Sequence, residues 1–366
     1  MGETPRAIPL DKDLFAAPGG VYQAITSMHP RDRVVALHKY EPVGRTVAVG
    51  DSPAAPWVRR DSGVAYRRVI QAYDVQQATA NVATNRFSRP SGVFRGVKMI
   101  EVPKDQVEEY WLPEDGAKRL VDSGGEDELE RQCVDALRLL TDVTQVPLRS
   151  LGVTGSLLWR SHHAGSDLDV VVYGRQATFK FLEGVEALLA ASSRVRPFSE
   201  ERLVAVAETL RRKSGLPLGE CVSYVRRKKF YLTFDGKFLS VAFVPTPAEV
   251  GLFPSYEDVS FVTLGPVTVR CVVENASFGY YYPSIVGVKD VRVVKWEGDL
   301  RGDFSGDVRR VFSMERELSS YVEEGEEIEV RGLLQRVEGP RDHYYQVYLG
   351  SAELFGSEYV RVLGPE

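Results

Sequence analysis

The sequence has little cysteine and no excess of positive charge, and both shortages limit what the protein can be. Its 366 residues include three cysteines, Cys133, Cys221 and Cys271, which lie far apart and form no C-x-x-C pair. This spacing argues against a disulfide framework and a thiolate zinc site, and it predicts reduced, buried thiols. The formal net charge of −5 excludes the basic character of a dedicated nucleic-acid-binding protein, so any contact with a polyanion must be local.

Long apolar runs are also missing. No stretch reaches the roughly 18 consecutive apolar residues of a membrane span, and the opening MGETPRAIPLDKD has no basic region followed by an apolar core. We therefore expect a cytoplasmic protein without a membrane partner. Hydrophobic residues make up 43% of the chain, which is enough to bury a core, and the length predicts two or three domains.

The N-terminal third of the chain has the pattern of a β-rich domain. Between residues 20 and 102, short apolar runs such as VYQAI, RVVALHKY and VAYRRVIQAY are separated by Pro, Gly and Asp clusters. Residues 53–56 and 88–96 are predicted to be loops. The polar stretch at residues 113–125 is predicted to contain the first domain boundary.

The middle of the chain mixes helical and strand patterns. Apolar residues recur at helical spacing in EDELERQCVDALRLLTDV, and further helices are predicted near residues 177–190 and 200–212, the last one capped by Ser199. KKFYLTF and KFLSVAFV flank Asp235-Gly236, a dipeptide that favours a tight β-hairpin turn. This region is therefore predicted to contain both helices and a short mixed sheet.

Strand patterns return from about residue 251, in PVTVRCVV, SIVGVKDVRVV, EIEVRGLLQRV and HYYQVYLG. They predict a C-terminal β-barrel-like domain. The predicted organisation is an α+β chain with an N-terminal β-rich domain (1–117), a central domain with a short mixed sheet and helices (118–250), and the C-terminal domain (251–366).

The chemistry is concentrated in the string GVTGSLLWRSHHAGSDLDVVVYG. Asp167 and Asp169 stand two residues apart at the start of a strand-like run, so both carboxylates are expected on one face. Such a pair offers hard oxygen ligands to Mg²⁺. Gly155 and Ser156 end a short apolar run, where a glycine lets backbone N–H groups approach phosphate oxygens. These residue types indicate phosphate and metal chemistry.

The string resembles the signature of the DNA polymerase β superfamily of nucleotidyltransferases. That signature is a strand ending in Gly-Ser, a loop or short helix of roughly ten residues, and a strand carrying Asp-x-Asp. The resemblance implies that Gly155 and Ser156 contact the nucleotide phosphates. It also implies that Asp167 and Asp169 are the catalytic residues and hold the metal, Mg²⁺ or Mn²⁺.

The wider chain is similar to a group of archaeal proteins known as predicted nucleotidyltransferases, at GGVYQAI, RVVALHKY and VRCVVENASF as well as in the signature. The implied fold of the central domain is polymerase β-like. The implied function is Mg²⁺-dependent transfer of a nucleotidyl group from a nucleoside triphosphate to a hydroxyl acceptor. The acceptor stays open among nucleic acid, protein and small molecule.

One position departs from the superfamily pattern. A third carboxylate is usual on a later strand, and in KFLSVAFV the corresponding place is taken by Ser240. Loss of that carboxylate would lower the rate by roughly two to four orders of magnitude. The alternative function is therefore a catalytically impaired nucleotide-binding or regulatory module. Glu220 or Asp235 could compensate, although Asp235 is explained more simply as a turn residue.

Other features leave two interpretations each. The tetrad 226–229, RRKK, could direct Arg226 and Lys228 from a strand toward the triphosphate, or it could form a solvated strand edge. The aromatic residues at 278–282 could stack on nucleic-acid bases, which would favour an RNA-binding protein, or they could fill a core. His162 and His163 lack further metal ligands at suitable spacing and are predicted to line the nucleotide site.

Overall fold

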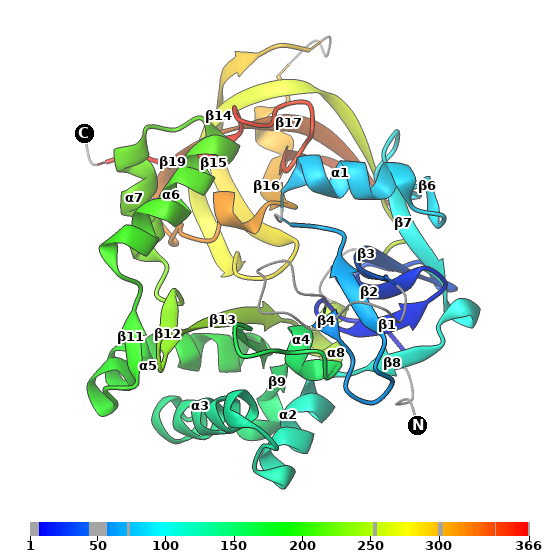
Figure 1. Cartoon of the computed structure of the whole chain (residues 1–366). Helices are drawn as coiled ribbons and strands as arrows, with labels where there is room; N and C mark the ends of the chain where they lie inside the picture. The colour runs from blue at the N-terminus through cyan, green and yellow to red at the C-terminus, as the bar shows by residue number, and fades with distance from the viewer. Residues whose placement is uncertain are drawn as a thin grey trace.

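The structure is a computed structural model that describes residues 7–43, 57–71, 74–251, 255–298, 303–340 and 342–364. In this part of the chain there are three β-sheets and eight α-helices, so the predicted mixture of α and β structure is confirmed. Figure 1 shows the three sheets following one another along the chain: the N-terminal strands in blue and cyan at the right, the central sheet with its helices below, and the C-terminal strands above.

The N-terminal sheet consists of β1 (Leu14–Ala17), β2 (Gly20–Ala24), β3 (Arg33–Pro42), β4 (Trp57–Val58), β5 (Ala65–Arg68), β6 (Ser88–Pro90), β7 (Lys98–Pro103) and β8 (Glu109–Trp111). Its order is β4-β5-β3-β2-β1-β8, and β7 pairs with both β3 and β6. The strands predicted at VYQAI and RVVALHKY are confirmed. Residues 53–56 lie outside the described residues, and the loop predicted at 88–96 is wrong at its start, where β6 pairs with β7.

One helix of this region, α1 (Val75–Thr84), has no clear signal in the sequence. It is capped by Asp74, whose side chain accepts the backbone N–H of Gln77, but the residue that it buries is the polar Asn81. The asparagine Oδ1 accepts the backbone N–H of His38 on β3 at 3.2 Å. Because polar hydrogen bonding fixes this helix, apolar periodicity does not reveal it.

The polar stretch at 113–125 is a helix, α2 (Pro113–Ser123), rather than a linker. Proline stands in its first turn, and Gly124 ends it in the left-handed conformation with φ 73°. Ala117 and Leu120 on this helix join the core of the central sheet. The predicted division at residue 117 therefore falls inside a helix that packs with the central region.

The remaining helices of the central region are α3 (Glu128–Thr144), α4 (Gly155–Leu158), α5 (Arg175–Ala191), α6 (Glu200–Ser214), α7 (Leu218–Arg227) and α8 (Pro247–Val250). The helices predicted as α3, α5 and α6 are confirmed. The Ser199 hydroxyl caps α6 by accepting the backbone N–H of Arg202, as expected. Short 3-10 turns occur at Lys104–Gln106, Leu148–Ser150, Ser305–Asp307 and Arg316–Leu318.

The central sheet contains β9 (Leu151–Val153), β10 (Leu168–Tyr173), β11 (Val195–Pro197), β12 (Leu232–Phe234) and β13 (Lys237–Val244). Its order is β11-β12-β13-β10-β9, and β10 and β13 run parallel while the other pairs are antiparallel. The predicted hairpin is confirmed: β12 and β13 are joined by Asp235 and Gly236 at φ 47° and 76°.

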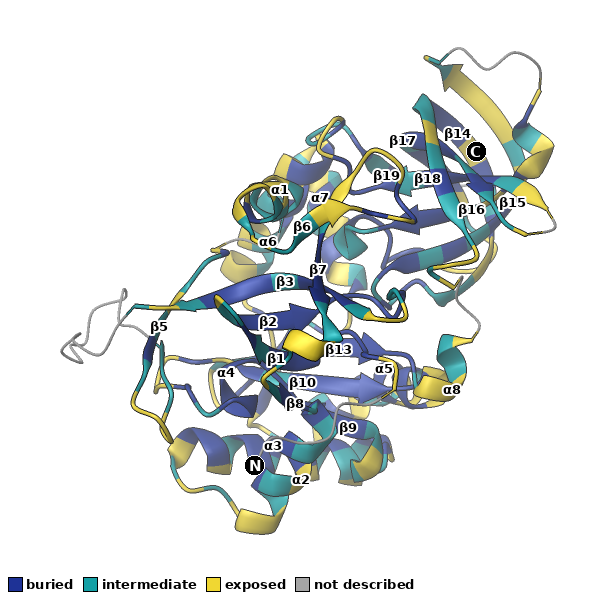
Figure 2. Ribbon diagram, turned by 90° about the vertical axis from the view of Figure 1, so that its right-hand side faces the viewer, coloured by how far each residue is buried: buried dark blue, intermediate teal, exposed yellow. Residues whose placement is uncertain are grey.

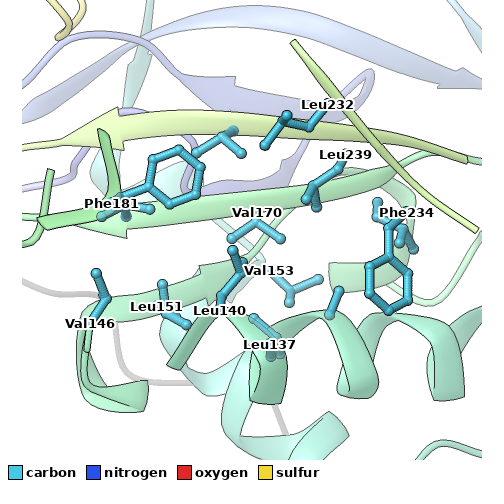
Figure 3. Packing of buried hydrophobic residues seen from close by; sticks show 14 of the residues in the cluster. Leu137, Leu140, Val146, Leu151, Val153, Val170, Phe181, Leu232, Phe234 and Leu239 are labelled. Carbon is cyan, nitrogen blue, oxygen red and sulfur yellow. The ribbon is translucent and has the colours of Figure 1, made fainter. Parts of the chain in front are cut away.

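Helices cover one face of this sheet. Val170 on β10 and Leu239 on β13 point toward Leu137 and Leu140 of α3, and Phe181 of α5 joins the same core (Figure 3). Because successive strand residues face opposite sides, the residues next to Val170 and Leu239 point away from these helices.

The C-terminal sheet is formed by β14 (Ser260–Phe278), β15 (Ser284–Trp296), β16 (Val308–Ser313), β17 (Glu327–Glu338), β18 (His343–Leu349) and β19 (Tyr359–Val362). Its order is β14-β15-β16-β18-β17-β19, and a further pairing of β14 with β17 closes the sheet on itself. The strands predicted here are confirmed. Figure 2 shows buried residues along these strands and exposed ones at the outer part of β15, where Val294 is 52% exposed.

The aromatic residues at the end of β14 and just after it lie between the C-terminal sheet and the central region. Tyr281 is fully buried in the same core as Leu137 and Phe181, and Phe278 and Tyr280 pack against that core. The interpretation that these aromatics fill a core is therefore confirmed. The side chains of Phe278, Tyr280 and Tyr281 thus connect the C-terminal sheet to the core of the central sheet.

Candidate functional site

Gly155 and Asp169 are in direct contact beside the central sheet. The backbone N–H of Thr154 donates to the carbonyl oxygen of Asp169 at 2.9 Å, which fixes the start of α4 against β10. Gly155 has φ +63°, and a Cβ built on it would lie 2.1 Å from Oδ2 of Asp169. Glycine is needed here both for the left-handed backbone and for the space that the carboxylate occupies.

The Asp169 side chain points away from the core that lies between the central sheet and its helices. Val170 and Val172 belong to that core, whereas Val171 packs with Leu10 of the N-terminal region in a separate cluster. Alternation along β10 places Asp169 on the same side as Val171. The carboxylate is therefore on the face of the sheet that the N-terminal region approaches.

Asp167 lies just before the first residue of β10 and is exposed, whereas Asp169 is half-buried. Although the residue as a whole is exposed, protein atoms around its carboxyl group keep part of the water away, and this effect and, after it, the negative charge of Asp169 raise the pKa of the Asp167 carboxyl. A bound cation relieves the repulsion between two neighbouring carboxylates, so such a pair favours cation binding. In the described parts of the chain, no ion pair joins either carboxylate to an arginine or lysine within 4 Å.

Ser240 is the direct partner of Asp169 in the parallel pairing of β10 and β13. Paired residues of neighbouring strands lie on the same face, about 5 Å apart, so the serine stands beside the aspartate. The two acids considered as replacements are engaged elsewhere: Glu220 pairs with Arg361 at 2.9 Å, and Asp235 pairs with Arg194 at 2.6 Å. Neither is available as a third carboxylate in this structure.

Ser156 follows Gly155 in the single turn of α4. Its side chain is buried, with 7% of the residue exposed, and its carbonyl oxygen accepts the backbone N–H of Ser161 at 2.9 Å. The described residues contain no group of three or more His, Cys, Asp or Glu side chains arranged to hold a metal. The candidate donor set is thus the pair Asp167 and Asp169.

The tetrad 226–229 covers the last two residues of α7 and the first two residues after it, and it is not in a strand, so the predicted strand alternation is wrong. Arg226 is on α7 and pairs with Glu200 at 2.6 Å. Lys228 is buried, and its Nζ donates to the carbonyl oxygen of Glu317 at 2.9 Å. Burial lowers the pKa of Lys228 to about 7. Helical spacing of the buried Cys221, Tyr224 and Val225 explains the helix, and cations are favoured at its C-terminus.

The adjacent histidines have separate environments. His162 is buried, and its Nε2 lies 2.8 Å from Oδ2 of Asp127, the residue that caps α3. His163 is exposed, and its ring centroid lies 5.9 Å from that of Trp57. His162 therefore links the loop between α4 and β10 to the start of α3.

Three cations that local sequence patterns do not single out act on Asp167, at the end of this loop. The positive charges of Arg202, Arg68 and Lys237 act on Asp167 and lower its pKa, against the larger effect of burial. They come from α6, β5 and β13, so no local spacing connects them in the sequence. Packing of distant segments brings them together.

No helix in the described part of the chain is long and apolar enough to cross a membrane. No protein-family model matches the chain, and no solved structure matches it. The chain is 24% identical over 235 residues to an uncharacterized protein of Methanocaldococcus jannaschii. The match covers 64% of each of the two chains. This relative is archaeal, and its name states no activity.

Proposed function

We propose that the protein is a Mg²⁺-dependent nucleotidyltransferase with a polymerase β-like central domain, which transfers a nucleotidyl group from a nucleoside triphosphate to a hydroxyl acceptor. The observation that carries the proposal is the contact of the Asp169 carboxylate with Gly155, at a position where a Cβ would lie 2.1 Å from Oδ2. A glycine that makes room for an acid beside Ser156 is the arrangement that phosphate and metal binding would require.

The residues fit a hard divalent cation. Asp167 and Asp169 are oxygen donors close enough for their charges to interact, and Mg²⁺ is usually held by one or two carboxylates together with substrate phosphates and water. When bound, the cation would neutralise charge on the transferring phosphoryl group. The two aspartates would hold it, Gly155 would keep the approach open, and Ser156 would stand next to the phosphates.

A second candidate is a nucleotide-binding module with impaired transfer. It is favoured by Ser240, which pairs with Asp169 on the neighbouring strand and supplies no third carboxylate. A hydroxyl acceptor would then lack a base on this side of the site, so transfer would be slower by roughly two to four orders of magnitude. Nucleotide binding would be retained.

Calorimetry of Mg²⁺ binding with a non-hydrolysable nucleotide tests the proposal. We expect one firmly bound Mg²⁺ and a metal-dependent rise in melting temperature, because a ligand of the folded state stabilises it. Asp167→Asn with Asp169→Asn should abolish that rise, whereas the exposed Asp142→Asn should retain it. An unchanged rise in the double variant would contradict the proposed ligands.

Transfer of a labelled nucleotide separates the two candidates. Ser240→Asp should add a second metal position and increase transfer if the serine limits the reaction. If the natural protein already binds two metal ions and Ser240→Asp does not accelerate it, the impaired module is excluded.

A further inference from the structure

The cations around Asp167 are held in place by contacts of three different elements. Lys237 opens β13, and its Nζ donates to the carbonyl oxygen of Ala164, in the loop that leads to Asp167. Lys237 is half-buried and lies three residues before Ser240, the partner of Asp169. Its amine is therefore held against the loop that leads to Asp167.

Arg202 approaches from the first turn of α6. Its guanidinium lies 5.3 Å from the ring centroid of Phe198, and Phe198 in turn lies 5.0 Å from Phe238, the residue after Lys237. The side chain of Arg202 is exposed, and in the described residues it makes no ion pair with a carboxylate within 4 Å. Its positive charge lowers the pKa of Asp167, and its exposed side chain is accessible to an anion.

Arg68 belongs to the N-terminal sheet. Its guanidinium lies 5.7 Å from the ring of Trp57, which neighbours His163, and Tyr66 on the same strand lies 5.0 Å from Trp159. These contacts place the end of β5 on the loop between α4 and β10. The N-terminal sheet thus contributes a positive charge to a site whose carboxylates belong to the central sheet.

We infer that Arg202, Lys237 and Arg68 form a polyphosphate-binding site that does not require the metal and that bridges the N-terminal sheet and the central region. The inference rests on the proposed function for the identity of the anion, the triphosphate of the nucleotide. Guanidinium and ammonium groups bind phosphate oxygens by charge-assisted hydrogen bonds, and three of them from separate elements can hold a chain of phosphates at several points.

The experiment measures binding of inorganic triphosphate to the full chain in the presence of EDTA. We expect binding that weakens with added salt. Arg202→Gln, Lys237→Gln and Arg68→Gln should each weaken it, by about tenfold or more for a lost charge-assisted contact. Arg212→Gln is the matched control, because this exposed arginine lies on the same helix about 15 Å further along. The melting temperatures of all variants verify their folding.

Removal of the two carboxylates provides a second test of the polyphosphate site. Asp167→Asn with Asp169→Asn removes two repelling anions, so metal-free triphosphate binding should persist or become tighter. This result would support the polyphosphate site even if metal binding and transfer failed. Binding that appears only with Mg²⁺, or equal loss in Arg212→Gln, would overturn the inference. Tighter binding of a short oligonucleotide than of triphosphate would also overturn it, since the site would then hold a phosphodiester backbone.

Discussion

Gly155→Ala tests the contact between the glycine and Asp169 most directly. The substitution adds one methyl group in two unfavourable ways, because the backbone is left-handed at φ +63° and the new carbon would lie 2.1 Å from Oδ2 and 3.0 Å from Cγ of Asp169. The backbone conformation costs about 1–2 kcal/mol for a residue with a Cβ. Crowding of a packed site adds about 1–3 kcal/mol. We expect a loss of about 3 kcal/mol in the free energy of unfolding.

Gly124→Ala separates the two contributions. Gly124 ends α2 with a similar φ of +73°, but no atom lies within 4 Å of the position of its missing Cβ. This control should lose about 1–2 kcal/mol, the cost of the backbone alone. Urea unfolding, followed by circular dichroism, gives both values, and calorimetry should show that Mg²⁺ binding fails in Gly155→Ala and persists in Gly124→Ala.

A double-mutant cycle with Asp169→Ala identifies the source of the excess. With the carboxylate removed, Gly155→Ala should cost no more than Gly124→Ala, so the two substitutions should be coupled by about 2 kcal/mol. If Gly155→Ala and Gly124→Ala destabilise equally, and Asp169→Ala changes neither cost, the carboxylate does not lie against Gly155 and the reasoning is refuted.

Two further predictions concern buried ionisable side chains outside the site. Burial lowers the pKa of His29 from 6.5 to about 3, so below pH 6.5 the unfolded chain binds a proton that the folded protein does not. The free energy of unfolding should therefore fall by about 2 kcal/mol between pH 7 and pH 5. Urea unfolding should show a smaller decline in His29→Gln. Parallel pH profiles of the two proteins would contradict this prediction. The Lys213 side chain is 4% exposed and contacts Glu315 and Glu317, each at 2.9 Å. Lys213→Met should therefore lower the free energy of unfolding by about 3 kcal/mol in thermal unfolding, whereas Lys118→Met, at an exposed position, should change it little. Equal effects of the two substitutions would contradict this prediction.

Local signals predicted the elements around the site. The β12–β13 hairpin follows from Asp235-Gly236, since both residues tolerate positive φ. The helix α3 follows from apolar residues at helical spacing with Asp127 as its cap. The pair Asp167 and Asp169 was found because two residues of one strand-like run are related by sequence spacing alone.

Features that depend on packing between distant segments were missed. The convergence of Arg68, Arg202 and Lys237 depends on contacts such as that of Phe198 with Phe238, which neither segment reveals by itself. The position of the tetrad 226–229 just before the hairpin predicts a strand there, whereas burial of Tyr224 and Val225 favours the helix that the structure has. Local periodicity is a weak guide where charged residues end a short helix.

The position of Tyr281 has a consequence for how this protein can be divided. The tyrosine closes the core beneath the central sheet, yet it belongs to the turn between β14 and β15. A fragment cut at residue 250 would retain both aspartates but would uncover an apolar surface normally filled by Tyr281, with Phe278 and Tyr280 beside it. The smallest cooperative folding unit therefore extends beyond the sheet that carries the carboxylates. Limited proteolysis should release no stable central fragment.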